Sequence, residues 1–509
     1  MIGTLLGVLG AVLKWVFTPL PLAVLACTMA TIYYLMTKDY GFWKARGVPG
    51  PTPTFPYGNE FGPPLADFIG FEEWIYNTQG GKKFCGYIEM ARPVLYVGDL
   101  DLIRAITIKD FESFTDRRDL AISEDFMEML QVLNGKEWKD TRSVMSPTFS
   151  SSKLRAMHQL CLDNASNLND YVKAEMKRTG GEIDIKDCFG RFTMDNIASC
   201  AFGVNCNSFK DPNTEFAKNA AVLFEAPTGF AAVRLTLLVL LGNIVQKILP
   251  DPLKSVNQFF ARVVNRTINE RQTGDRRKDF LQLLLDTKDK DGKRILTDSS
   301  IIAQSVLFFI VGYDTTAKLL TFAAYCLATN PEVQDGILSE IDEVLERHKG
   351  QLTYEALGEM YQLDRAISET LRLYPPAARI ERLSSKEYTL PGTNVTIPKG
   401  TVVQMPIFTL HRDPDHYPDP MRFDPDRFLP EEKEKRHPCA YIPFGSGPRN
   451  CIAMRFALFE AKVALAAMLR ETRLEPGPNT PKPPMPLDKR AFLLTPEGNK
   501  AFLRAVPRK

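Results

Sequence analysis

One cysteine in this chain stands where its sulfur could bind a metal. Cys451 follows a Gly-rich stretch, residues 444–450, and precedes the apolar run Met454 to Leu469, whose spacing predicts a helix. The sulfur would lie at the helix N-terminus, where unpaired N–H groups and the helix dipole favour a thiolate over a thiol. Arg449 adds a permanent positive charge two residues away. The alternative is an inert, packed cysteine, which is the usual state of a lone one.

The stretch before Cys451 is suited to approach a flat ligand. Gly445 and Gly447 allow a tight turn and a close approach, and Pro448 stiffens the loop. A thiolate presented in this way can ligate haem iron, and its electron donation favours cleavage of an O–O bond. The pattern Phe-x-x-Gly-x-Arg-x-Cys, which begins at Phe444, is expected by chance in about one chain of this size in a thousand. We therefore predict that Cys451 is an iron ligand.

A second polar group interrupts an apolar helical run. Asp314-Thr315-Thr316 lies within Thr297 to Ala328, where such residues are unfavourable. Thr315 can donate to a carbonyl one turn earlier and bend the helix, and with Gly312 it would open a groove for O2 and water. The hydroxyl could then act as a proton donor, with Asp314 relaying protons from outside. The alternative is a helix cap, but the apolar run continues past the motif.

Both motifs resemble those of the cytochrome P450 family, and the resemblance covers nearly the whole chain. Closest are animal microsomal members of the drug- and steroid-oxidising branch, with families 3 and 6, which share SGPRNCI at 446–452, MRFA at 454–457 and RIER at 379–382. Two positions depart from the family pattern: Ala453 stands where Gly is usual, and Val311 where Ala or Gly is usual. We expect altered loop packing and a narrower distal pocket, without loss of activity.

The resemblance implies the fold and the cofactor. The fold would be mainly α with small β-sheets, of the cytochrome P450 haem-thiolate type, after a single N-terminal transmembrane helix. The cofactor would be haem b with Cys451 as axial thiolate and Phe444 shielding the sulfur. Arginine side chains and an indole N–H would bind the two haem propionates. By similarity these groups are Trp138, Arg142, Arg382 and Arg449, with Arg117 as a further candidate.

A structural network is implied as well. Glu369 and Arg372 lie one helical turn apart, and in the family they join a later arginine, here Arg427, in a buried cluster beneath the haem. The alternative is a surface pair worth about 1 kcal/mol or less. His411 is the one histidine that invites a ligand role, but no paired spacing supports it and we favour a structural role.

The implied reaction is NADPH-driven monooxygenation of a lipophilic substrate such as a xenobiotic, a steroid or a fatty-acid-like molecule. No nucleotide-binding Gly-rich fingerprint is evident, so electrons would come from NADPH–cytochrome P450 reductase, docked near Lys139 and Arg455, with cytochrome b5 as a candidate second donor. Substrate would contact the loop from Phe126 to Leu130, the 377–378 and 491–492 pairs, and the apolar helix. The named candidates are Phe126, Phe308, Phe309, Ala377 and Phe492.

Two other functions remain open on the same residues. One is a haem-thiolate isomerase or dehydratase that rearranges peroxides, and the other is a non-catalytic haem- or sterol-binding membrane protein. Asp314 and Thr315 argue against both, because neither function needs a proton relay to dioxygen.

The N-terminus predicts a membrane anchor. Trp15 to Met36 carries no charge and is long enough to span a bilayer, whereas a cleaved signal peptide would be shorter and end in a cleavage site. Lys38, Lys44 and Arg46 follow, which places the remainder in the cytosol by the positive-inside rule. With the resemblance, we expect an anchor at 1–37, a Pro-rich linker at 38–58 and a catalytic domain at 59–509, single-pass in the endoplasmic reticulum membrane.

Composition excludes some classes. The 509 residues are 44% hydrophobic, and 63 Lys+Arg against 61 Asp+Glu give a net charge of +2, so nucleic acid is not an expected partner. Nine scattered cysteines without a Cys-x-x-Cys pair favour reduced thiols. The apolar stretch Leu235 to Leu249 could be a buried helix or a surface that dips into the bilayer. Further helices are expected at 152–177, 253–272 and 331–349, strands at 87–97, 389–397 and 491–506, and irregular structure at 412–443.

Overall fold

The computed structural model describes residues 19–59, 67–118, 127–211, 213–224, 248–251, 253–273, 279–288, 291–292, 294–491 and 493–508, together with residues 234, 237, 245 and 277. The expectation of a mainly helical chain with small sheets is confirmed. Most of the stretch 235–249, and the substrate candidates Phe126 and Phe492, lie outside the described residues.

The helices supply most of the framework. The four long ones expected from periodicity are present, each within two residues of the expected ends: α6, α11, α13 and α14. In chain order the helices are α2 (Pro19–Thr37), α3 (Phe68–Thr78), α4 (Leu100–Arg104), α5 (Gly135–Met145), α6 (Ser151–Thr179), α7 (Ile185–Ile197), α8 (Glu215–Phe224), α11 (Lys254–Thr273), α12 (Phe280–Leu285), α13 (Asp298–Thr329), α14 (Pro331–Arg347), α15 (Tyr354–Gly358), α16 (Tyr361–Leu373), α17 (Pro430–Lys435) and α18 (Met454–Glu471).

Among the described residues, three small sheets complete the fold. The largest has the order β1-β2-β7-β4, in which β2 and β7 are parallel and the other neighbours antiparallel. A second has the order β3-β9-β8, and β5 pairs with β6. The strands are β1 (Phe84–Glu89), β2 (Arg92–Val97), β3 (Glu182–Asp184), β4 (Arg379–Leu383), β5 (Tyr388–Thr389), β6 (Thr396–Ile397), β7 (Val402–Pro406), β8 (Thr472–Glu475) and β9 (Phe502–Pro507).

The strand expectations need correction in detail. The single strand expected at 87–97 is part of a hairpin, because the chain reverses at Met90, which has a φ of 55°. A positive φ is uncommon for methionine, so the sequence does not predict this turn. Of the expected strand at 491–506, only β9 forms, after a turn at Gly498 with a φ of 66°. Residues 412–443 are irregular as expected, apart from short helical turns and α17.

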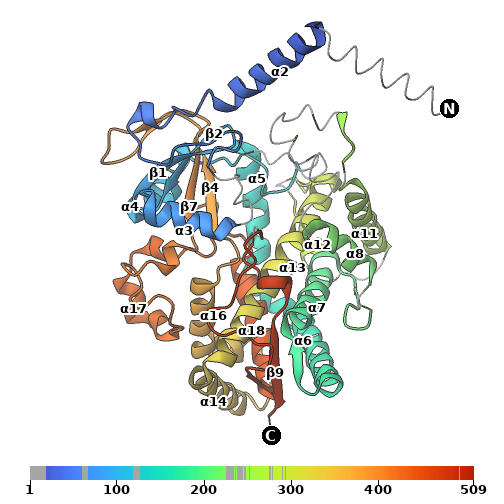
Figure 1. Cartoon of the computed structure of the whole chain (residues 1–509). Helices are drawn as coiled ribbons and strands as arrows, with labels where there is room; N and C mark the ends of the chain where they lie inside the picture. Colours follow the sequence, from blue (N-terminus) through green and yellow to red (C-terminus); the bar gives the residue numbers. More distant parts are fainter. Residues whose placement is uncertain are drawn as a thin grey trace, which may run out of the picture.

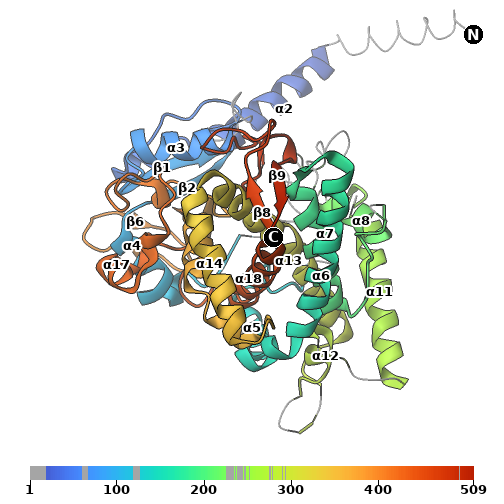
Figure 2. The same cartoon turned by 90° about the horizontal axis from the view of Figure 1, so that it is seen from below.

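Helix α13 runs through the middle of the main hydrophobic core. It packs against α7, α16 and α18, and Figure 1 shows the β1–β2 region on one side of the molecule and α6, α7, α8 and α11 on the other. The view from below agrees (Figure 2). Because α13 is apolar nearly all round, it is suited to this central place.

By length and composition alone, α13 is also the one helix among the described residues that could cross a membrane. Its apolar window is 72% buried inside the protein, which marks it as a core helix. The shorter apolar stretch Leu22–Thr37 of α2 is different, because its side chains are mostly exposed and Figure 1 shows α2 projecting from the body.

The segment expected to be a linker is packed onto the folded body. Trp43 is buried, and its indole N–H donates to the Tyr87 carbonyl at 3.0 Å. Gly86 leaves room for that ring, since a Cβ there would lie 2.2 Å from it, and the Gly86 N–H donates to the Pro49 carbonyl at 2.8 Å. Residues 43–50 are therefore part of the β1 side of the domain rather than a free spacer.

Candidate active site

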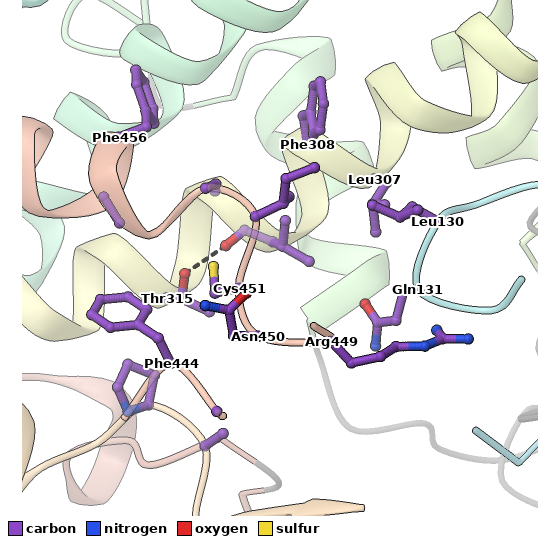
Figure 3. Close-up of a pocket in the computed structure, with 18 of the residues that line it drawn as sticks. Leu130, Gln131, Leu307, Phe308, Thr315, Phe444, Arg449, Asn450, Cys451 and Phe456 are labelled. Atoms are coloured by element: carbon purple, nitrogen blue, oxygen red, sulfur yellow. Dashed lines mark hydrogen bonds between the residues drawn. The ribbon is translucent and has the colours of Figure 1, made fainter. Parts of the chain in front are cut away.

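A cavity of about 300 Å³ lies beside the middle of α13 and reaches the loop before α18. Figure 3 shows side chains entering it from α13, from that loop and from the segment that carries Leu130 and Gln131. Cys451 and Thr315 both line this cavity, and most of the other lining residues are apolar. The two sequence motifs are thus brought to a single, mostly apolar cavity.

Cys451 lies just before α18, which begins at Met454 after the N-cap residue Ala453. The Cys451 N–H donates to the Phe444 carbonyl at 2.8 Å, which closes the loop. Burial raises the pKa of the Cys451 thiol, while the Ala453 N–H, Arg142 and Arg117 act in the opposite direction. The helix end thus favours the thiolate, as expected, and the arginines that act with it are Arg142 and Arg117, while burial of the sulfur opposes it. A metal cation on the sulfur would supply the missing stabilisation.

The loop glycines hold the sulfur in place through backbone contacts. Gly445 and Gly447 have φ values of 75° and 72°, in the left-handed region. A Cβ on Gly447 would lie 1.7 Å from the Thr107 carbonyl oxygen, within the π-helical turn Ala105–Lys109. Ala453 has φ −93° and ψ 11°, which any residue adopts, so the departure from the family glycine costs no backbone strain.

Thr315 behaves as its sequence context predicts. Its hydroxyl donates to the Val311 carbonyl at 2.5 Å, a bond drawn in Figure 3. Gly312 and Val311 also line the cavity. A Cβ on Gly312 would meet the Ile197 side chain at 2.7 Å, so this glycine allows α7 and α13 to pack closely. The valine is accommodated, and its side chain forms part of the cavity wall.

Asp314 does not line the cavity. Its carboxylate forms a buried ion pair with Lys318, one turn along α13, at 2.6 Å. A relay through Asp314 would first have to break this pair. The i,i+4 spacing of the two residues was visible in the sequence and was the signal that reasoning from the motif alone left out.

Four arginines gather at one end of the cavity with few anionic partners. Arg117, Arg142, Arg382 and Arg449 all line it, and so does Trp138, whose ring lies 4.2 Å from the Arg449 guanidinium. Burial, together with Arg117, lowers the pKa of Arg382 to about 9 and that of Arg449 to about 9. Such a cluster is electrostatically unfavourable unless an anion neutralises it.

The arginines also carry unpaired donors. Arg449 donates to the Thr115 and Leu133 carbonyls at 2.8 and 2.7 Å. Among the described residues, its buried Nη1 has no hydrogen-bond partner, and neither does Nε of Arg382. Arg142 donates twice to Asn450 at 2.9 Å. Two carboxylates at this end of the cavity would satisfy the free donors and the excess charge. The residues present therefore fit a haem, whose propionates are such a pair and whose iron would meet Cys451.

Glu369, Arg372 and Arg427 come together as the resemblance implies. Arg372 donates through two nitrogens to the Glu369 carboxylate, both at 2.7 Å, and both side chains are fully buried. Arg427 approaches the same carboxylate at 3.6 Å, and the Asp424 N–H donates to it at 2.9 Å. The alternative of a surface pair is therefore wrong. The cluster fastens α16 to the irregular segment before the Cys451 loop.

Some of the predicted substrate-contacting residues line the cavity and others do not. Phe308 and Ala377 line the cavity, and Leu493 does so next to the undescribed Phe492. The expectation for Phe309 is wrong, because its ring is fully buried on the opposite side of α13, 4.8 Å from Phe260. One residue along a helix turns a side chain by about 100°, and an all-apolar helix gives no sequence signal for which of two phenylalanines faces the cavity.

Several lining residues were not anticipated. Gln131 and Leu307 belong to no motif, and only their nearness to Leu130 and Phe308 in the sequence could have pointed to them. Ile380 lies within the RIER stretch at 379–382, of which only Arg382 was assigned to the site. His411 is fully buried, accepts the Ile442 N–H at 2.9 Å and has its pKa lowered to about 3 by burial. It lies outside the cavity lining, in keeping with a structural role.

Comparison with known proteins agrees with this geometry. A family model for Cytochrome P450 matches residues 71–502. Cytochrome P450 9e2 of Blattella germanica is 37% identical over 92% of this chain and 94% of the relative. Cytochrome P450 6B2 of Helicoverpa armigera is 35% identical over 96% and 98%.

A mammalian relative matches equally well. Cytochrome P450 3A31 of Mesocricetus auratus is 36% identical over 95% of this chain and 96% of its own length. With a candidate thiolate ligand, an arginine-rimmed apolar cavity and near-complete matches of this kind, the chain belongs to the cytochrome P450 family, whose members hold haem iron through a cysteine thiolate and whose general reaction is monooxygenation.

Proposed function

We propose that this protein inserts one atom of O2 into a lipophilic substrate, a xenobiotic, steroid or fatty-acid-like molecule, with electrons from NADPH delivered by a separate reductase. The observation that carries the proposal is that Cys451 and Thr315 line one apolar cavity whose end is rimmed by unneutralised arginines. When bound, the haem supplies the activation of O2 and the transfer of oxygen to carbon.

The chain's own residues would position the haem and supply a proton to the cavity. Arg142, Arg382 and Arg449 would hold the propionates, and Cys451, which lines the cavity with Phe444, would supply the sulfur ligand. The Thr315 hydroxyl lines the cavity and donates its single proton to the Val311 carbonyl, so it would act as a proton donor to the cavity after rotating away from that bond. Asp314 would take part only in a conformation released from Lys318.

The proposed substrate class is based on the apolar side chains that line the cavity. Phe308, Val311 and Ala377 present apolar surface, and such cavities select ligands by shape and hydrophobicity. These apolar side chains support a lipophilic substrate.

We propose further that the protein is anchored in the endoplasmic reticulum membrane through residues 1–37, with the catalytic domain on the cytosolic side. The exposed, apolar α2 supports the anchor. Lys139 and Arg455 are exposed, as a docking surface for an acidic reductase requires. Cytochrome b5 is a second candidate for the same surface.

The first test is the carbon monoxide difference spectrum of the reduced protein, alongside a Cys451→His variant. The wild type should give the strongly red-shifted Soret band of thiolate ligation, and the variant a band of the histidine type. NADPH consumption with reductase and a panel of lipophilic compounds follows. A wild-type band without the red shift would overturn the ligand assignment. A red-shifted band with turnover of hydroperoxides alone would favour the isomerase alternative.

A further inference from the structure

A buried glutamine ties one wall of the cavity to the helix that carries Thr315. Gln304 lies on α13 and is fully buried. Its side-chain amide makes two hydrogen bonds to the backbone of residues 127–133, here called the wall segment. Nε2 donates to the Glu128 carbonyl at 2.5 Å, and Oε1 accepts the Leu130 N–H at 2.9 Å.

Gln304 shares a helix face with the cavity residues of α13. Phe308, Val311 and Thr315 follow it at intervals of four, three and four residues, which keeps all four on one side of a helix. The last three line the cavity, whereas Gln304 lies about 16 Å along the axis from Thr315, by the usual rise per residue. It can therefore act on the cavity only through the segment that it binds.

The wall segment is held at both ends. Gln304 binds its start, and at its far end the Leu133 carbonyl accepts a hydrogen bond from Arg449 at 2.7 Å. Between these two fixed points lie Leu130 and Gln131, both of which line the cavity. The position of this wall thus depends on a link to α13 on one side and to the Cys451 loop on the other.

A primary amide is the side chain that this place requires. One backbone acceptor and one backbone donor must be satisfied together, and an amide offers both a donor and an acceptor, while a carboxylate or an aliphatic side chain does not. The Leu130 N–H is buried, and an unpaired buried backbone group is costly. The sequence around Gln304 gives no such indication, because a lone glutamine in an apolar helix belongs to no motif.

We propose that Gln304 is a positioning residue that sets the place of the Leu130–Gln131 wall and so determines which ligands fit the cavity. The inference rests on the proposed function of this cavity as the substrate site. It assigns no contact between Gln304 and substrate.

The test compares two variants, each of which removes a buried glutamine amide that hydrogen-bonds a backbone N–H and a backbone carbonyl. Gln304→Leu breaks the link to the wall segment. Gln334→Leu is the matched control, because Gln334 is also fully buried and also bridges a backbone donor and acceptor, those of Leu474, away from the cavity. Spectral titration with imidazole and with 4-phenylimidazole then measures affinity. Imidazole is too small to need the wall, whereas the phenyl group must fit against it.

For Gln304→Leu we expect the Kd of 4-phenylimidazole to rise about tenfold, because loss of the two buried hydrogen bonds would displace the wall segment against which the phenyl group binds. The Kd of imidazole should change less than twofold, and Gln334→Leu should change neither. An unchanged ratio of the two Kd values in Gln304→Leu, or the same change in Gln334→Leu, would overturn the proposal. The carbon monoxide band of the wild type reports separately on the proposed function.

Hydrogen exchange gives a readout that does not depend on bound haem. Gln304→Met keeps the length of the side chain but loses both hydrogen bonds of the amide to the wall segment. Peptides covering 127–133 should exchange faster in both Gln304 variants, and those covering β8 faster only in Gln334→Leu. Unaltered exchange at 127–133 would contradict the proposed link even if one variant fails to retain haem.

Discussion

Two threonines of α13 make the same hydrogen bond but face different surroundings. Thr315 and Thr321 each donate to the carbonyl four residues earlier, at 2.5 and 2.7 Å, and only Thr315 lines the cavity. We predict that Thr315→Ala lowers product formed per NADPH about tenfold or more, since a positioned proton donor contributes at least that much. Unused electrons should appear as hydrogen peroxide. Thr321→Ala, measured in the same assay, should keep wild-type coupling, and equal losses in both variants would refute the role.

Glu369 illustrates what a buried charge does when its partner is removed. Glu369→Ala leaves the fully buried Arg372 without its carboxylate, which we expect to cost about 3–5 kcal/mol. The variant should therefore fail to retain haem, measured as the haem-to-protein ratio. Glu355→Ala breaks the exposed pair with Arg155 at 2.7 Å and should leave the ratio unchanged. A stable, haem-loaded Glu369→Ala protein would contradict the argument.

At this scale the sequence was informative where side chains act locally. The bond from Thr315 to Val311 and the pairing of Glu369 with Arg372 both follow from helical spacing. The burial of Phe309 against Phe260 of α11 and the raised pKa of the buried Cys451 thiol do not, because both depend on segments that pack there from elsewhere in the chain. Long-range packing of this kind is absent from a local pattern.

Among elements, the Cys451 loop depends on a close backbone approach. Gly447 and Gly392 both have left-handed φ values, 72° and 70°, but a Cβ on Gly392 would meet nothing within 4 Å. We predict that Gly392→Ala costs only about 1–2 kcal/mol of stability, the cost of a left-handed alanine. Gly447→Ala must also push the loop away from Thr107 and should lose the thiolate-type carbon monoxide band. Equal behaviour of the two variants would show that the approach to Thr107 is unimportant.

The contact of α18 with α7 carries a pH-sensitive group. Glu460 of α18 is fully buried, accepts a hydrogen bond from Asn196 at 2.7 Å, and burial raises its pKa to about 8. In the unfolded chain this carboxyl ionises near pH 4.5, so the stability that the protonated form provides is lost as the pH rises from there to about 8.

Replacing this carboxyl with an amide should remove that loss. We predict that Glu460→Gln raises the melting temperature by a few degrees at pH 8 and leaves it nearly unchanged at pH 5. Thermal melting of haem-loaded wild type and variant at both pH values measures the difference. A gain at pH 5 as large as that at pH 8 would show that the effect is packing rather than ionisation.

At the scale of the whole molecule, the sequence predicted the Pro-rich segment itself better than how that segment packs on the folded body. The Pro-rich stretch Val48–Pro53 indicates a stiff spacer, and the sequence contains nothing to show that Trp43 inserts against β1. That contact joins residues more than forty positions apart, and it needs the missing side chain of Gly86 to form. The proposed anchor would therefore end near residue 37, because residues 43–50 already pack on β1.

Two truncations test this boundary. Removal of residues 2–37 takes away α2, whose side chains are mostly exposed, and should leave haem content and the carbon monoxide band unchanged while alkaline carbonate releases the protein from microsomes. Removal of residues 2–50 also deletes Trp43, and loss of a buried tryptophan costs about 3–5 kcal/mol, so this protein should unfold at lower temperature and lose haem. If the shorter deletion stayed in the carbonate pellet, the anchorage would lie elsewhere in the chain. If the two truncated proteins melted alike, the packing of residues 43–50 on β1 would contribute nothing to the catalytic domain.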